Sequence, residues 1–218
     1  MHVRDTPPTA ASIVFDMDGT LFDSSSAVPD AYITTLHKRA GLTLSREDVI
    51  ACYPLGPPIN ILRHFMGDAA SNEDVRNYHA ELDRQSAGLV PYTGIVDLFQ
   101  DLHRRAVPCA VFTGADTASC LLLMRNCGLA SFFPTERLLG TDLVAHPKPA
   151  PDGLLYTCAQ LQMSPESVAY VGDSPLDQRA AFSAGCIPVS AGWGHLHDAQ
   201  EPTLFIAHTP ADVVQLLP

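Results

Sequence analysis

Beyond residue 90, the sequence alternates between short apolar runs, typical of buried strands, and longer runs that are typical of helices. The strand-like runs, together with one earlier in the chain, lie at 11–16, 107–114, 167–174 and 186–192. The helix-like runs lie at 116–128, 150–162 and 175–185. Strands that alternate with helices pair in parallel and place helices on both faces of the sheet. The sequence therefore predicts an α/β fold, a doubly wound, mostly parallel, Rossmann-like sheet.

A second pattern interrupts this alternation between the first strand and the second. Four helix-like runs follow one another there, at 28–41, 45–53, 57–67 and 71–88. Two of them begin with Ser-x-x-Asp, the spacing of a capping box. We therefore expect an inserted α-helical cap domain over residues 24–91, with the α/β core formed by residues 1–23 and 92–218.

Composition narrows the class of protein. The chain has 218 residues, of which 46% are hydrophobic and 17% charged, and its net charge is −11. This charge argues against a nucleic-acid or anionic-membrane partner. No unbroken apolar window is as long as a membrane span, and the first residues lack the apolar core of a signal peptide, so we expect a cytoplasmic protein. The six cysteines include no C-x-x-C pair, which favours reduced thiols over disulfides or a metal site.

Polar side chains directly follow three of the predicted strands. Asp16 and Asp18 follow the first strand, Thr113 and Gly114 follow the second, and Asp173 follows the third, with Asp177 four residues later. The carboxyl ends of parallel strands meet at one edge of a sheet, where ligands bind. A single polar residue at each position is equally well explained as a turn or a helix cap. A turn or a helix cap does not explain the Asp-x-Asp pair after the first strand equally well, because one capping residue would be enough there.

Clustered carboxylates at a sheet edge suit Mg²⁺, which prefers oxygen ligands and would offset the cost of burying the charges. An anionic substrate would need a cation of the protein as well. The chain has eleven arginines but only two lysines, and one of these, Lys148, lies in a loop stiffened by Pro147, Pro149 and Pro151. A compact ammonium in a rigid loop is a candidate for binding such a substrate.

These residues carry a resemblance to a known family. The strings DMDGT, FTGA, KPAPD and VGDSPLD, in this order, are similar to the four motifs of the haloacid dehalogenase-like hydrolases. The similarity covers roughly residues 12–23 and 92–200. The spacing resembles the branch with a helical cap between the first two motifs, which includes the phosphoglycolate phosphatase-like enzymes.

The resemblance implies a role for each motif residue. Asp16 would be the nucleophile that forms an aspartyl-phosphate, and Asp18 would be the general acid and base. Thr113, Gly114 and Lys148 would bind the phosphoryl group. Asp16, the Asp18 carbonyl oxygen and Asp173 would hold Mg²⁺, with Asp177 in support. An acid at position 18 favours phosphate esters over halides, because an alkoxide, unlike a halide, leaves poorly without a proton.

The implied activity is that of a Mg²⁺-dependent phosphatase of a small, phosphoglycolate-like phosphorylated metabolite, and we expect a monomer or weak homodimer. A sugar phosphomutase is an alternative, but its typical Gly-x-Ser-Arg is absent from the cap loop, where Gly56-Pro57-Pro58 stands. A nucleotidase or a pyrophosphatase is a further alternative. A signalling receiver module would lack the helical insertion and the Asp-x-Asp pair, and a degenerate binding protein would not keep every motif residue.

Other polar residues have a less specific interpretation. Arg63 could reach a substrate carboxylate, but a solvated surface position explains it better. His146 could touch the site because it lies two residues before Lys148. His195 and His197 lie in a polar loop, where solvated histidines are more common than metal ligands.

Overall fold

The computed structural model describes residues 7–218, so residues 1–6 of the expected first core segment lie outside the described residues. The core is a six-stranded sheet in which every neighbouring pair is parallel, in the order β3-β2-β1-β4-β5-β6. The strands are β1 (Ser12–Phe15), β2 (Cys109–Phe112), β3 (Leu138–Leu139), β4 (Val168–Gly172), β5 (Ile187–Ala191) and β6 (Phe205–Ala207). The four predicted strands are confirmed, and β1 lies at the centre, between β2 and β4.

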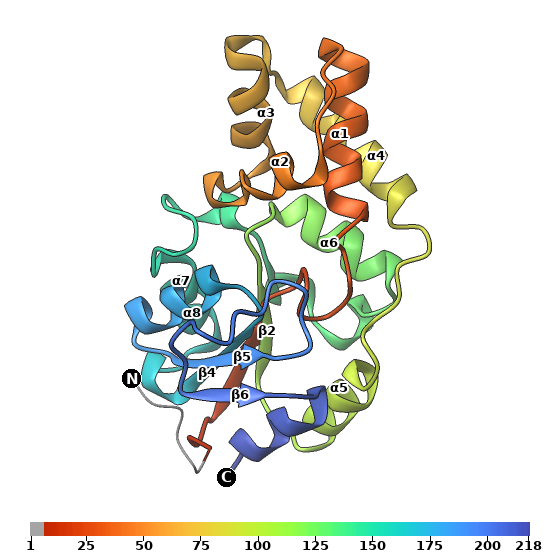
Figure 1. Cartoon of the computed structure of the whole chain (residues 1–218). Coiled ribbons are helices and arrows are strands. Elements are labelled where there is room, and N and C mark those ends of the chain that lie inside the picture. Colours follow the sequence, from red (N-terminus) through yellow and green to blue (C-terminus); the bar gives the residue numbers. More distant parts are fainter. Residues whose placement is uncertain (1–6) are drawn as a thin grey trace.

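Helices cover both faces of this sheet (Figure 1). They are α5 (Ile95–Arg104), α6 (Thr117–Asn126), α7 (Asp152–Leu161) and α8 (Pro175–Ala184). Alternate residues of β1 enter two separate hydrophobic clusters: Val14 packs with α7 and α8, whereas Ile13 and Phe15 pack with α5 and α6. The predicted doubly wound α/β architecture is therefore confirmed.

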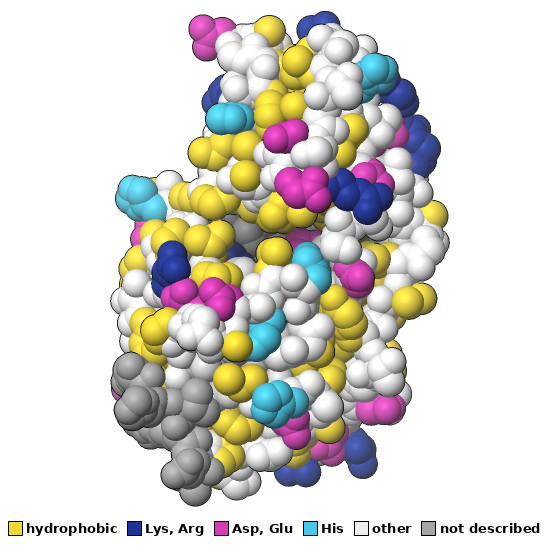
Figure 2. All heavy atoms as spheres, viewed as in Figure 1, with side chains coloured by type: hydrophobic (Ala, Val, Ile, Leu, Met, Phe, Trp, Pro, Cys, Tyr) yellow, Lys and Arg dark blue, Asp and Glu magenta, His cyan; other side chains and the backbone are white. Residues whose placement is uncertain are grey.

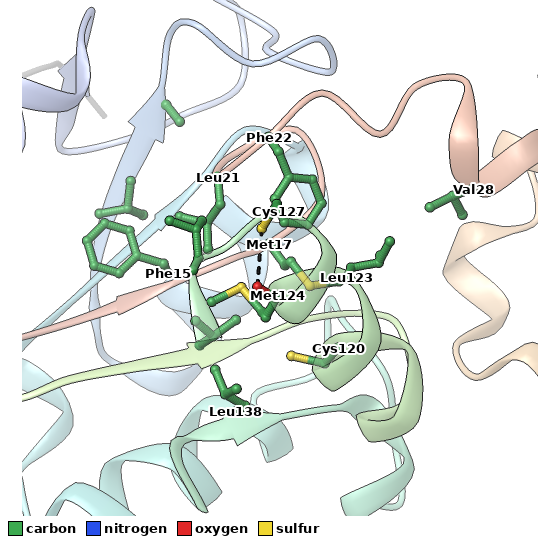
Figure 3. Packing of buried hydrophobic residues seen from close by; sticks show 14 of the residues in the cluster. Phe15, Met17, Leu21, Phe22, Val28, Cys120, Leu123, Met124, Cys127 and Leu138 are labelled. Atoms are coloured by element: carbon green, nitrogen blue, oxygen red, sulfur yellow. Dashed lines mark hydrogen bonds between the residues drawn. The ribbon is translucent and has the colours of Figure 1, made fainter. Parts of the chain in front are cut away.

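The alternation continues past the end of β1 and orients the Asp-x-Asp pair. Figure 3 shows Met17 beside Leu123 and Met124 of α6, and Phe15 belongs to the same hydrophobic cluster. Met17 is fully buried in this cluster, as are the two α6 side chains. Because successive side chains of an extended segment point in opposite directions, Asp16 is turned away from the α6 cluster. Packing of the apolar residues thus fixes the direction of the intervening carboxylate.

Four helices between β1 and α5 stand beyond the carboxyl ends of the strands (Figure 1). They are α1 (Ala27–Ala40), α2 (Arg46–Ile50), α3 (Pro58–Met66) and α4 (Asn72–Gln85), and we refer to them as the cap. Both expected capping boxes form, at the start of α2 and of α4. Helices α1 and α4 pack together through the stacked rings of Tyr32 and Tyr78, whose centroids are 4.1 Å apart.

The cap is joined to the core by polar contacts between α4 and α6. His79 Nε2 lies 3.0 Å from Asp116 Oδ2, at the N-terminus of α6. At the other end of α6, the Asn126 amide donates to Asp83 and Ser86 of the α4 end, over 3.0 and 2.9 Å. These contacts hold α4 against the helix that follows β2.

Two further features bear on the composition-based expectations. Among the described residues, no helix is long and apolar enough to cross a membrane. The six cysteines carry free thiols, and five of them are buried.

The two short edge strands β3 and β6 were not predicted, because runs of two and three residues are too short to show a periodic pattern.

A glycine controls how closely α7 approaches β2. A Cβ atom at Gly153 would lie 1.8 Å from Phe112 Cζ, inside the ring that packs over it. We expect Gly153→Ala to lower the unfolding free energy by about 1–3 kcal/mol, because the close-packed ring has to shift. Urea denaturation followed by circular dichroism measures the change. The matched control is Gly88→Ala, whose new Cβ meets open space and should change stability by less than about 0.5 kcal/mol. Equal effects of the two substitutions would contradict the packing argument.

Candidate active site

The motif residues converge on one cavity of about 310 Å³ between the core and the cap. Figure 2 shows a hollow at this boundary, rimmed by hydrophobic side chains. Every residue for which the sequence predicted a direct contact with substrate or metal lines this cavity: Asp16, Asp18, Thr113, Gly114, Lys148 and Asp173. They come from the ends of β1, β2 and β4 and from the loop before α7, so the parallel sheet brings them to one edge as expected.

Lys148 forms the centre of a buried ionic network. Its ammonium lies 2.7 Å from Asp16 Oδ1 and 2.6 Å from Asp177 Oδ1, and the Lys148 side chain is only 8% exposed. The ammonium also donates to the Tyr170 hydroxyl over 3.2 Å. That hydroxyl in turn donates to the Phe112 carbonyl oxygen over 2.8 Å, which links β4 to β2. The lysine side chain is therefore held in one position from three sides.

The electrostatics of this network are unbalanced toward negative charge. Burial raises the pKa of Asp16 well above its usual value, and repulsion by Asp177 raises it further, although Lys148 opposes the shift. Burial by itself would lower the pKa of Lys148, but its two carboxylate partners more than offset this and raise it. One ammonium thus stays charged, and it does not neutralise all of the carboxylates around it.

Asp173 sits in a tight pocket of backbone. Gly19 and Gly194 surround it: a Cβ atom at Gly19 would lie 2.2 Å from Asp173 Oδ2, and one at Gly194 would lie 2.1 Å from Asp173 Cβ. The Leu196 N–H donates to Oδ2 over 2.9 Å. Gly19 adopts a φ of +77°, which favours glycine on its own account. The two glycines let the chain close around the carboxylate.

Two buried carboxylate oxygens at the cavity have no hydrogen-bond partner among the described residues, and they are Asp173 Oδ1 and Asp18 Oδ1. Burial raises the pKa of Asp173 to about 7, and repulsion by Asp177 adds to this effect. Burial also raises the pKa of Asp18. Buried oxygen atoms without a partner are costly, so they call for a proton or a cation.

The carboxylates are arranged closely enough to hold a metal ion. Asp16, Asp173 and Asp177 each offer one oxygen, and these oxygens lie within 4.8 Å of one another. Asp16 and Asp173 are two of the ligands expected from the sequence. Asp177 is engaged elsewhere, because its Oδ1 accepts from Lys148 and its Oδ2 from the Ser174 N–H and hydroxyl. This arrangement fits the supporting position expected for Asp177, and an all-oxygen site suits a hard divalent cation.

The end of β2 supplies the expected hydroxyl. Thr113 is almost fully buried, and its N–H donates to the Leu139 carbonyl oxygen over 3.1 Å. Its hydroxyl oxygen accepts from the Ala115 N–H over 3.2 Å, which turns the chain into α6. Thr113 and Gly114 thereby face the same cavity as Asp16.

Some sequence candidates lie elsewhere. The His146 side chain is 73% exposed and contacts Asp152, so it does not reach the cavity. Arg63 is exposed on α3 and does not line the cavity, as its surface interpretation predicted. His197 contacts the Ser190 hydroxyl. His195, in contrast, does line the cavity, although the sequence favoured a solvated position for it.

Sequence reasoning missed Tyr170 and the cap side of the cavity. Tyr170 stands in a run of apolar strand residues, and its hydroxyl was the only signal that could have singled it out. The cap contributes Tyr32, Tyr53 and Tyr78 to the lining. In the sequence these tyrosines look like ordinary packing residues of amphipathic helices, and no motif marks them.

Comparison with known proteins agrees with the motifs. A family model described as haloacid dehalogenase-like hydrolase matches residues 13–190. A probable phosphatase, IndB of Dickeya dadantii, is 33% identical over 208 residues, which are 89% of this chain and 88% of that protein. The pyrophosphatase PpaX of Anoxybacillus flavithermus is 27% identical, with 94% and 96% of the two chains covered. A phosphoglycolate phosphatase of Salmonella paratyphi A is 28% identical, with 84% and 81% covered.

A solved structure shares the fold. CbbY from Rhodobacter sphaeroides, in complex with phosphate, superposes with a TM-score of 0.79 at 20% identity, covering 94% of this chain and 96% of that one. The family match and the phosphatase-named relatives support a phosphoric monoester hydrolase. The matched region contains the entire cap and the sheet, apart from Ser12 of β1, Ala191 of β5 and the whole of β6. The chain therefore belongs to the haloacid dehalogenase-like hydrolases.

Proposed function

We propose that the protein is a Mg²⁺-dependent phosphatase that hydrolyses a small phosphorylated metabolite through an aspartyl-phosphate. The observation that carries this proposal is the placement of Asp16 and Asp18 on one cavity, with the Lys148 ammonium 2.7 Å from Asp16. A nucleophile, a proton carrier and a fixed positive charge are the groups that phosphoryl transfer through a covalent intermediate needs.

In the first step, a carboxylate oxygen of Asp16 attacks phosphorus, and the bond from phosphorus to the ester oxygen breaks. Asp18 gives its proton to the departing alkoxide. Burial raises the pKa of Asp18, which favours the protonated form that this step requires. Thr113, Gly114 and Lys148 bind the phosphoryl oxygens and hold them in line with Asp16.

In the second step, the Asp18 carboxylate accepts a proton from water as the water oxygen attacks phosphorus. The bond between phosphorus and Asp16 breaks, inorganic phosphate leaves, and Asp18 is protonated again. Asp16, Asp173 and the Asp18 carbonyl oxygen would hold Mg²⁺, which when bound neutralises part of the negative charge of the carboxylates and the phosphoryl group. Asp177 positions the Lys148 ammonium for both steps.

We also propose roles for the cap, a cellular location and an oligomeric state, as expected from the sequence. Residues 24–91 act as the cap domain, which excludes water and positions the leaving group. The enzyme works in the cytoplasm as a monomer or weak homodimer. The absence of the phosphomutase string favours hydrolysis over transfer to a second hydroxyl.

A screen of phosphorylated metabolites for release of inorganic phosphate tests the proposed function. It is run with Mg²⁺ and with EDTA, and it includes phosphoglycolate, pyrophosphate, nucleoside monophosphates and a sugar phosphate. We expect phosphate release that depends on Mg²⁺. Isomerisation of a sugar phosphate without phosphate release would favour a phosphomutase. Selective cleavage of pyrophosphate would favour a pyrophosphatase, and selective cleavage of a nucleoside monophosphate would favour a nucleotidase.

Substitution of the two aspartates should have different effects. Asp16→Asn should abolish turnover without any covalent species, because the nucleophile is lost. Asp18→Asn should slow turnover by about 10²–10⁴-fold. With p-nitrophenyl phosphate, whose leaving group needs little protonation, phospho-Asp16 should accumulate in Asp18→Asn.

Intact-protein mass spectrometry after a rapid acid quench detects the added phosphoryl group. The double variant Asp16→Asn with Asp18→Asn is the control and should never carry it. Slow phosphate release by Asp18→Asn without any phosphoenzyme would show that Asp18 does not serve the second step.

The buried carboxylates also predict how pH changes the effect of the cation. The pKa of Asp173 is raised to about 7 in the folded protein, so the folded state binds more protons than the unfolded state between about pH 4 and about pH 7. Without a cation, stability should therefore fall as pH rises from about 4 to about 7. Mg²⁺ relieves the repulsion of ionised carboxylates, so it should raise the Tm more at about pH 8 than at about pH 6.

Differential scanning fluorimetry with and without Mg²⁺ measures this difference. Asp173→Asn should lose the Mg²⁺ shift at both pH values. Asp68→Asn, which makes the same charge change at an exposed position of the cap, should keep it. A shift that is equal at both pH values, or larger at low pH, would contradict the assignment of the cation to these carboxylates.

A further inference from the structure

The two sides of the cavity differ in chemistry. The core side carries Asp16, Asp18, Asp173 and Lys148. The cap side of the described lining has no charged side chain, and its aromatic and aliphatic residues include Tyr32, Tyr53, Tyr78, Ile50, Ala51 and Ile61. In the proposed reaction the phosphoryl group occupies the core side, so the rest of the substrate faces the cap.

A second negative charge on the substrate would find no unpaired cation in this lining. Among the described residues that line the cavity, only Lys148 and His195 can be positively charged. Lys148 is already paired with Asp16 and Asp177. His195 Nδ1 lies 3.7 Å from Asp23 Oδ1, a carboxylate that would balance its charge. The other charged side chains of the lining are carboxylates, which repel a second anion.

The cap instead offers aromatic and aliphatic surface beside the reacting atoms. The Tyr32 and Tyr78 rings are stacked and almost fully buried, so they form a rigid wall. Tyr53 lines the same cavity as Asp18. Because Asp18 is the proposed proton donor to the leaving group, Tyr53 faces the cavity that the leaving group occupies. Such rings bind apolar and aromatic groups through contact area and ring stacking.

We infer that the substrate is a phosphate monoester of a small, uncharged alcohol with an apolar or aromatic group, and that a leaving group with its own carboxylate or phosphate is disfavoured. This inference rests on the proposed phosphatase function. It narrows the substrate class away from phosphoglycolate and pyrophosphate, each of which carries a second anionic group. It also assigns Ile50, Ala51, Tyr53 and Ile61 to substrate selection.

Three primary alkyl phosphates separate charge from leaving-group reactivity. Benzyl phosphate, propyl phosphate and phosphoglycolate all release a primary alkoxide, but only the last carries a carboxylate. We expect kcat/KM for benzyl phosphate to exceed that for phosphoglycolate by about tenfold or more, with propyl phosphate in between. A kcat/KM for phosphoglycolate or pyrophosphate equal to or above that for benzyl phosphate would overturn the inference.

A charge placed in the cap provides a matched test of the same idea. Ala51 is exposed and lines the cavity, so Ala51→Arg would add a cation that a substrate carboxylate could reach. We expect this variant to shift the ratio of kcat/KM values about tenfold toward phosphoglycolate. Leu55→Arg is the control, because Leu55 is 39% exposed in the same segment but does not line the cavity. Equal shifts in the two variants would show that the cap lining does not select the substrate.

Binding to the Asp16→Asn variant separates failure of this inference from failure of the proposed function. If no ester releases phosphate from the native enzyme, the phosphatase proposal fails. Calorimetry with Asp16→Asn and Mg²⁺ still compares benzyl phosphate with phosphoglycolate. Tighter binding of benzyl phosphate supports the inference, and equal or weaker binding overturns it.

Discussion

The contact of Lys148 with Asp16 and Asp177 is the interaction on which the site depends. It buries an ammonium between two carboxylates at distances of 2.7 and 2.6 Å, with Asp173 nearby. Isolated buried charges are costly, and a buried pair repays that cost only when its geometry is good and its remaining hydrogen bonds are made. Here Tyr170 and Ser174 complete those bonds. The lysine still leaves an excess of negative charge, which is why the cavity suits a divalent cation. Burial, together with repulsion between the carboxylates, raises the pKa values of Asp16 and Asp173.

The sheet order makes this contact possible. Since β1 lies between β2 and β4, its Asp16 is adjacent both to Thr113 after β2 and to Asp173 after β4. Lys148 reaches the same point from a loop that precedes α7, and α7 packs closely on β2 because Gly153 leaves room for Phe112. Three neighbouring parallel strands and one helix therefore bring together groups that lie more than 130 residues apart.

The sequence predicted the core and the motif residues because their signals are local. Buried parallel strands read as continuous apolar runs, and polar residues at their ends must meet at one edge of the sheet. Tyr170 was not predicted as part of the lysine network, because its role depends on which residues the fold places opposite its hydroxyl. The edge strands β3 and β6 were missed because they have two and three residues. Tyr32 and Tyr78 were missed because a tyrosine that packs between helices and one that also lines a cavity have the same sequence pattern.

These differences explain why the sequence indicates the reaction more clearly than it indicates the substrate. The core must handle a phosphoryl group, whose charge and geometry are the same in every ester, so its requirements fall on a few fixed residue types. In the proposed reaction, the cap contacts the part of the substrate that varies, and it does so with contact surface that many residue types can supply. The uncharged lining of this cap is informative because no special residue is needed to exclude a second anion. The carboxylates of the cavity already outnumber its lysine, so it is enough that the cap adds no further cation. Selection against charge therefore leaves no motif in the sequence, and it becomes visible only when the fold shows which side chains face the leaving group.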